Sequence, residues 1–129
     1  MDTLEILLSA SQMNTASQCE RKWGFTYLDG IRGPSSPSQQ LGTDVHSHAE
    51  NWLRDGTPPP DTRSGRIMRK GIGFIPSPSD KLLVEHKFWF ADGPLAWRGF
   101  IDCVDPSGPV IKVIDHKTTK NMRYAKTLE

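Results

Sequence analysis

Three successive strand patterns between residues 82 and 117 constrain the fold more than any other feature of the chain. The stretches 82–91, LLVEHKFWFA, and 95–104, LAWRGFIDCV, are rich in branched and aromatic residues, and the turn-prone DGP lies between them. They predict an antiparallel pair. After DPSGP, which is expected to form a four-residue hairpin loop over 106–109, comes VIKVIDHK at 110–117. This last stretch predicts a buried strand that ends on charged residues.

Helical patterns fill the first half of the chain. Ser9 and Ser11 are good helix caps, and apolar residues follow them at helical spacing as far as Leu28. Residues 33–40 have the composition of a loop, and the proline run at 58–60 predicts an exposed connector. The patterns predict helices over the following ranges: from the serine caps to Asp29, from Gly42 to Asp55, and 64–71.

Helices followed by strands in a chain of 129 residues predict one domain, over residues 1–129, of the α/β class with a mixed α+β sheet. The N-terminal helices are expected to pack on a mixed sheet of three or more strands. The net charge of +1 exerts no global attraction on nucleic acid. A polyanion would therefore have to be held by a local basic patch or a bound metal.

Two features of the composition bear on the cellular compartment. Cys19 and Cys103 match no CxxC spacing and no dense disulfide framework, which favours two thiols in a reducing environment. Cys19 is expected to pack in its helix as a small apolar residue. The N-terminus is unlike a signal peptide, and no segment approaches the length that spans a bilayer. The sequence therefore predicts a cytoplasmic protein without membrane contact.

Charged side chains gather at the end of the last predicted strand. Alternation along a strand puts Asp115 and Lys117 on one face and His116 on the other. With a four-residue loop, residue 102 pairs with residue 113, so Asp102 lies on the same face as Asp115, as its diagonal neighbour. Two carboxylates this close repel each other unless a cation neutralises them, which predicts a metal site.

The ligand types at this predicted site indicate its chemistry. Carboxylate oxygens with room for water suit Mg²⁺ or Mn²⁺, which link protein carboxylates to a phosphate. Lys117 would orient a hydrolytic water or stabilise negative charge on that phosphate. The pattern therefore predicts phosphodiester hydrolysis, with Asp102, Asp115 and Lys117 as the catalytic residues.

Two further segments offer additional groups to the site. His46 and Glu50 project from one face of the second predicted helix, which makes His46 a candidate metal ligand, whereas His48 lies on another face. Glu50 is either a group that supports the ligands or a surface charge that faces a lysine or arginine. Glu85, on the first predicted strand, is either an outer member of the site or a structural residue.

Five stretches of the chain follow one another in a characteristic order: CERKWGF, GTDVHSHAE, VEHKFWF, WRGFIDCVDP and VIDHKTT. In this order they resemble the RecB-type branch of the PD-(D/E)XK nuclease superfamily, which includes CRISPR adaptation nucleases and many phage exonucleases. The resemblance implies a restriction-endonuclease-like core. It implies an active site of His46, Asp102, Asp115 and Lys117, with the backbone carbonyl of His116 as an extra metal ligand. It also implies a Mg²⁺- or Mn²⁺-dependent deoxyribonuclease and favours an exonuclease.

Two departures from the family pattern concern the C-terminal part. The family continues with a helix and a strand after the D-x-K strand, whereas here a helix start at Thr118 or Thr119 leads only to Glu129, so the domain is expected to be incomplete. Some relatives bind an iron-sulfur cluster through a cysteine in the CERKWGF position and three near the C-terminus. Cys103 does not replace that trio, so no cluster is expected.

DNA, single-stranded or with a free end, is the expected partner, alongside a recombination or helicase protein. The four tryptophans are expected in the core, although an exposed one would suit stacking on single-stranded DNA. Several basic residues are candidates for phosphate contacts, with a solvated surface as the competing interpretation: Arg21, Lys22, Arg66, Arg69, Lys70, Lys120 and Arg123.

Two other functions also fit the sequence. A non-catalytic DNA-binding or assembly module with the nuclease fold would bind DNA without metal and without cleavage. A small zinc-binding structural protein would use His46, His48, His86 and His116, but these lack a compact ligand spacing.

Overall fold

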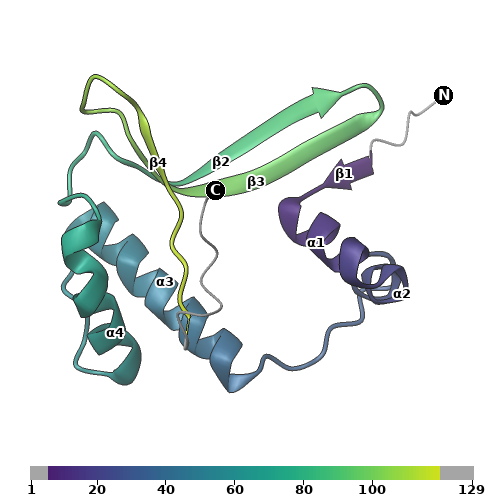
Figure 1. Cartoon of the computed structure of the whole chain (residues 1–129), viewed down its shortest axis with the longest axis horizontal. Coiled ribbons are helices and arrows are strands. Elements are labelled where there is room, and N and C mark those ends of the chain that lie inside the picture. The colour runs from purple at the N-terminus through teal and green to yellow at the C-terminus, as the bar shows by residue number, and fades with distance from the viewer. Residues whose placement is uncertain (1–5, 120–129) are drawn as a thin grey trace. The chain divides into compact units, whose positions relative to one another are not determined.

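The chain forms two compact units in the computed structural model, which describes residues 6–119. The first unit comprises the residues up to Pro34 together with Lys87–Phe100, and the second comprises Ser35–His86 together with the residues from Ile101 onward. Figure 1 shows the elements of both units. In the described residues, neither unit contains a helix that is long and apolar enough to cross a membrane. The single domain expected over residues 1–129 stays a prediction.

The first unit begins with a short strand and a series of helical segments. Ser9 caps the first helix as predicted, because its Oγ accepts a hydrogen bond from the Gln12 amide at 3.3 Å. The series ends before Gly30, whose left-handed φ of 68° suits glycine, close to the predicted helix end. In chain order the elements are β1 (Ile6–Leu8), α1 (Ala10–Gln18), α2 (Glu20–Trp23) and a π-helical turn (Gly24–Leu28).

The continuous helix predicted up to Asp29 is wrong at Cys19. The backbone of Cys19 is extended, with a φ of −162°, and its Sγ accepts a hydrogen bond from the Lys22 amide at 3.5 Å, so this residue begins α2. Cys19 is exposed, which also corrects the expectation that it packs as a small apolar residue. A capping thiol interrupts the helix without glycine or proline, so the apolar periodicity gave no sign of the break.

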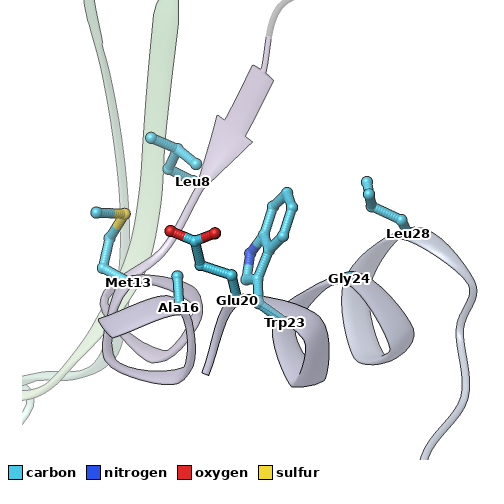
Figure 2. Close-up of a pocket in the computed structure, with 7 residues that line it drawn as sticks. All are labelled: Leu8, Met13, Ala16, Glu20, Trp23, Gly24 and Leu28. Atoms are coloured by element: carbon cyan, nitrogen blue, oxygen red, sulfur yellow. The ribbon is translucent and has the colours of Figure 1, made fainter. Parts of the chain in front are cut away.

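An apolar pocket of about 500 Å³ lies among the elements of the first unit (Figure 2). Leu8, Met13 and Trp23 contribute apolar surface, and Glu20 is the one ionisable residue of the lining. A single carboxylate without a histidine or a second acid makes a poor metal site. The pocket is therefore separate in its chemistry from the predicted metal site.

The second unit opens with α3 (Pro37–Asp55), which starts earlier than predicted. The Ser36 Oγ accepts a hydrogen bond from the Gln39 amide at 3.2 Å, and the Gln39 Oε1 accepts one from the Ser36 amide at 2.8 Å. This capping box, with proline in the first turn, begins a helix inside a run that has the composition of a loop. The loop predicted over 33–40 is therefore wrong in its second half, whereas the helix ends at Gly56 as predicted.

The helix α3 lies beside α4 (Arg63–Gly71), which matches the helix predicted over 64–71 (Figure 1). The His48 ring shares a 2.9 Å hydrogen bond with the Ser64 hydroxyl, which links the two helices. A 3₁₀ turn (Ile72–Phe74) follows α4. The buried apolar residues of the two helices are Ala49, Leu53 and Met68.

Four strands form one mixed sheet in the order β1-β3-β2, with β4 also paired to β3. β1 runs parallel to β3, and β4 runs antiparallel to it. The predicted mixed α+β class is confirmed, and the arrangement is consistent with a restriction-endonuclease-like fold. β1 has no counterpart among the predicted strands, whereas β2 and β3 match two of them. The later strands are β2 (Leu83–Asp92), β3 (Leu95–Asp105) and β4 (Lys112–Ile114).

The last strand is shorter and more exposed than predicted. Only Lys112–Ile114 form β4, in a register that joins residue 104 to 113, whereas the predicted register joins 102 to 113. The shift of two residues keeps each side chain on its predicted face, because side chains alternate with a period of two. The apolar residues expected to be buried here, Val110, Ile111 and Val113, are exposed. The body of the helix predicted from Thr118 or Thr119 lies outside the described residues.

Candidate metal centre

Ligand atoms from three elements converge in the second unit. His46 lies on α3, Glu85 on β2 and Asp102 on β3, and one ligand atom of each lies within 4.8 Å of the other two. The His46 Nε2 is 2.5 Å from the Glu85 Oε1 and 3.5 Å from the Asp102 Oδ1. The three side chains are partly buried, with exposed fractions of 33%, 23% and 12% respectively. We call these three residues the metal-ligand cluster.

Local structure on α3 and β2 sets the direction of two of these side chains. His46 shares a helical face with Leu53, which is fully buried two turns further on. Glu85 has a φ of 51°, a left-handed conformation that costs a non-glycine residue about 1–2 kcal/mol. Next to it, the Val84 carbonyl accepts a hydrogen bond from the Arg54 guanidinium at 3.4 Å. Backbone strain held in place by its surroundings is typical of functional sites.

Asp102 uses its two carboxylate oxygens differently. Its Oδ1 faces the His46 ring, while its Oδ2 accepts a hydrogen bond from the His116 backbone amide at 2.6 Å. This bond ties the segment that follows β4 to β3, next to the metal-ligand cluster. The Oδ1 atom stays available to a ligand.

His116 brings a second imidazole to the cluster. Its ring lies edge-on to that of His46, with centroids 5.8 Å apart, and its buried Nε2 has no hydrogen-bond partner among residues 6–119. Burial lowers the pKa of His116 below its usual value despite the opposing charge of Asp102, and His46 lowers it further. The ring is therefore neutral near pH 7. His116 thus contacts the cluster through its backbone amide and its ring. The sequence instead predicts its backbone carbonyl as a metal ligand, and that role stays a prediction.

Asp115 and Lys117 stand apart from the metal-ligand cluster. The Lys117 Nζ lies 3.1 Å from the Asp115 Oδ2, and the two side chains are 81% and 63% exposed. Asp115 is not a member of the group whose ligand atoms all lie within 4.8 Å of one another. The physical reason is that β4 ends at Ile114, so no further strand pairing holds Asp115 against β3. Glu85, rather than Asp115, is the acid that faces Asp102 across His46.

The position of Glu85 can be inferred from the sequence by counting residues from the hairpin turn, which the strand patterns alone do not do. A two-residue turn at Gly93-Pro94 would set residue 92 opposite residue 95, and the same count along two regular strands would set Glu85 opposite Asp102. Two acids directly opposite each other on neighbouring strands are destabilising. Counting back from the turn therefore indicates an acidic pair that requires a positive partner.

The other polar residues considered on α3 have partners elsewhere. Glu50 accepts a hydrogen bond from the Arg54 Nη2 at 2.8 Å, an ion pair along the helix surface. His48 is bonded to Ser64. Within the described part of the chain, the metal-ligand cluster is the one group of three or more histidine, cysteine or acidic residues with convergent ligand atoms, and it contains a single histidine. The set of four histidines considered for zinc is therefore not assembled there.

The donor atoms of the cluster fit a divalent cation. One imidazole nitrogen and two carboxylate oxygens are ligands by which proteins hold such ions. The two carboxylates also repel each other, and a cation would remove that repulsion. The His116 ring lies edge-on to the His46 ring of this donor set, and its buried Nε2 lacks a polar partner among residues 6–119.

Comparison with known proteins adds an independent finding. The model of the PD-(D/E)XK nuclease superfamily matches residues 7–70, a range that runs from β1 into α4 and includes His46. Glu85 and Asp102 lie outside that range, so their membership of the cluster rests on the structure alone. No curated protein and no solved structure matches the chain. Over residues 7–70 the chain is thus similar to the PD-(D/E)XK superfamily, whose members are generally nucleases and typically use divalent metals.

Proposed function

We propose that the protein is a deoxyribonuclease that hydrolyses phosphodiester bonds with Mg²⁺ or Mn²⁺ held at the metal-ligand cluster. The convergence of His46, Glu85 and Asp102 carries the proposal, because it gathers nitrogen and oxygen ligands from three separate elements. The superfamily match over residues 7–70 also supports it, and that range includes His46 but neither Glu85 nor Asp102. The order of the motifs along the sequence favours the RecB-type branch and an exonuclease.

The residues of the cluster have distinct roles in this proposal. His46, Glu85 and Asp102 would hold the cation, which when bound would supply positive charge at the scissile phosphate and favour ionisation of the attacking water. The His116 amide keeps Asp102 oriented through its 2.6 Å hydrogen bond. Glu50 and Arg54 support the strand that carries Glu85, because the Arg54 guanidinium bonds both the Glu50 carboxylate and the Val84 carbonyl.

Asp115 and Lys117 act on the exposed side of the cluster in this proposal. Chain connectivity keeps Asp115 next to His116, whose amide is bonded to Asp102. The Lys117 ammonium is accessible to a phosphate oxygen, since 81% of the side chain is exposed. If Lys117 bonded to the phosphate in place of Asp115, the carboxylate of Asp115 and the carbonyl of His116 would be free to help hold the cation.

Cleavage of linear and circular DNA by the purified protein, with Mg²⁺ or Mn²⁺, tests the proposal. The wild type should cleave linear DNA and, as an exonuclease, leave covalently closed circles intact. Asp102→Asn removes a negative charge but keeps an oxygen that accepts the His116 hydrogen bond, so it should lower the rate about a hundredfold or more while the chain stays folded. Lys117→Ala should cause a loss of about the same size.

Asp80→Asn is the matched control, because Asp80 is an exposed acid of the second unit outside the cluster. Its cleavage rate should equal that of the wild type. Undiminished cleavage by Asp102→Asn would contradict the proposal. Metal-independent DNA binding without cleavage would instead favour a non-catalytic DNA-binding or assembly module with the same fold.

A further inference from the structure

The outer part of the β2–β3 hairpin, Lys87–Phe100, belongs to the first unit and carries aromatic side chains on both faces. On one face three rings pack together. The centroids of Phe88 and Phe90 are 6.3 Å apart, as are those of Phe90 and Trp97, and the planes are nearly parallel. A Cβ at Gly99 would lie 2.6 Å from the Phe88 ring, so this ring packs directly over the glycine and would have to shift to admit a side chain. The aromatic residues of this face are engaged with one another.

The opposite face of the hairpin is different. Side chains alternate along each strand, and counting from the two-residue turn sets residue 89 opposite 98 and residue 87 opposite 100. The contact between the Phe88 ring and the Gly99 position agrees with this count. Lys87, Trp89, Arg98 and Phe100 therefore share one side, which we call the cation-aromatic face. Trp89 is 57% exposed and Phe100 is 61% exposed. Within residues 6–119, neither ring stacks on another ring, and neither cation forms an ion pair.

These properties match a particular kind of ligand. Large apolar side chains left exposed together mark contact surfaces. Both ionisable residues of the face, Lys87 and Arg98, are cations without a counter-charge in the described chain, so a negatively charged partner is favoured. Single-stranded nucleic acid offers flat base surfaces for the two rings and phosphates for the two cations. A duplex fits less well, because its bases are already stacked on each other.

We propose that the cation-aromatic face binds single-stranded DNA, with bases stacked on Trp89 and Phe100 and phosphates held by Lys87 and Arg98. This inference rests on the proposed nuclease function and narrows its substrate to single strands. In the sequence, Lys87 follows Glu85 by two residues, and Phe100 precedes Asp102 by two. The two strands that supply acids to the metal-ligand cluster thus also supply the whole face.

Fluorescence anisotropy of a dye-labelled oligothymidylate of about 15 nucleotides, titrated with the full chain in EDTA, measures binding without cleavage. Trp89→Ala and Phe100→Ala should each weaken binding about tenfold, because each removes a stacking surface for one base. Trp89→Phe retains a ring and should restore most of the affinity. Phe90→Ala removes a ring from the opposite face, as a matched control, and should leave the affinity unchanged.

The two cations are tested through the dependence of affinity on salt. Each lost phosphate contact lowers the slope of log K against log salt concentration by about 0.7 for single strands. Lys87→Gln and Arg98→Gln should each show this decrease. Lys81→Gln, a change of an exposed lysine outside the face, should keep the wild-type slope.

Unchanged affinity in both Trp89→Ala and Phe100→Ala would overturn the inference, and so would an equal loss in Phe90→Ala. Binding of a duplex as tightly as the single strand would overturn it as well. Sedimentation that shows dimers of the wild type and monomers of Trp89→Ala, without DNA binding, would assign the face to a second copy of the chain and also reject the inference. The titration measures DNA binding without metal, whereas the nuclease proposal is tested by metal-dependent cleavage. The two experiments can therefore fail separately.

Discussion

The metal-ligand cluster and the Asp115-Lys117 pair hold their charges in opposite ways. In the cluster, the partly buried acids Glu85 and Asp102 both face the Nε2 atom of His46, so their negative charges repel each other and a cation would relieve that repulsion. In the pair, an acid and a lysine satisfy each other at the surface, an arrangement that contributes at most about 1 kcal/mol. Under the proposed function, this difference predicts that metal binds at the cluster, whereas the pair exchanges its internal bond for a substrate.

The largest expected effect compares the two aspartates in metal binding. Asp102→Asn should weaken Mn²⁺ binding about a hundredfold, because it removes a charged ligand, whereas Asp115→Asn should weaken it severalfold at most. Isothermal titration calorimetry of the metal-free protein at pH 7 measures both affinities. Equal losses of Mn²⁺ affinity in the two variants would show that the cluster and the pair do not differ in metal binding.

A second comparison uses one glutamate of the cluster and one outside it. Glu85→Gln should weaken Mn²⁺ binding about tenfold or more, because Glu85 lies in the cluster. Glu20→Gln is the matched control, since Glu20 is an exposed glutamate of the first unit, and its Mn²⁺ affinity should stay close to the wild-type value. The same titration serves for both variants. A loss confined to Glu20→Gln would show that the cluster is not where the metal binds.

Much of the fold is predictable because local sequence decides it. Branched and aromatic residues on both sides of a short turn define β2 and β3, and a glycine with positive φ ends α3. The start of α3 depends instead on the bonds between Ser36 and Gln39, and β1 depends on a partner strand far along the chain. Hydrophobic periodicity reports neither kind of interaction.

The candidate site is predictable to a smaller extent. The residue types at His46 and Asp102 single them out, and the count from the hairpin turn would add Glu85. The separation of Asp115 from the cluster depends on how far β4 continues its pairing with β3, which tertiary packing determines. Alternation fixes the face of a side chain but not the length of a strand.

A third comparison separates the backbone strain at Glu85 from its charge. Glycine accepts a φ of 51° without steric cost, whereas alanine does not, so in EDTA Glu85→Gly should be about 1 kcal/mol more stable than Glu85→Ala. Both variants lack the carboxylate, so the charge cancels from the difference. Urea unfolding followed by circular dichroism measures it. Lower stability of Glu85→Gly would show that the strand is not strained at this residue.

The smallest expected effect concerns the stability of the pair itself. Asp115→Asn breaks an ion pair whose two side chains are 63% and 81% exposed, so water and salt already screen most of its attraction. The free energy of unfolding in EDTA should therefore change by less than about 0.5 kcal/mol. Lys117→Gln should give the same small change, and the double variant should lose no more than either single variant, because each change alone already breaks the pair. Urea unfolding at low and high salt measures all three. A much larger loss in either single variant would mean that the pair is part of the folded core, and Lys117 would then not be free to exchange Asp115 for a phosphate.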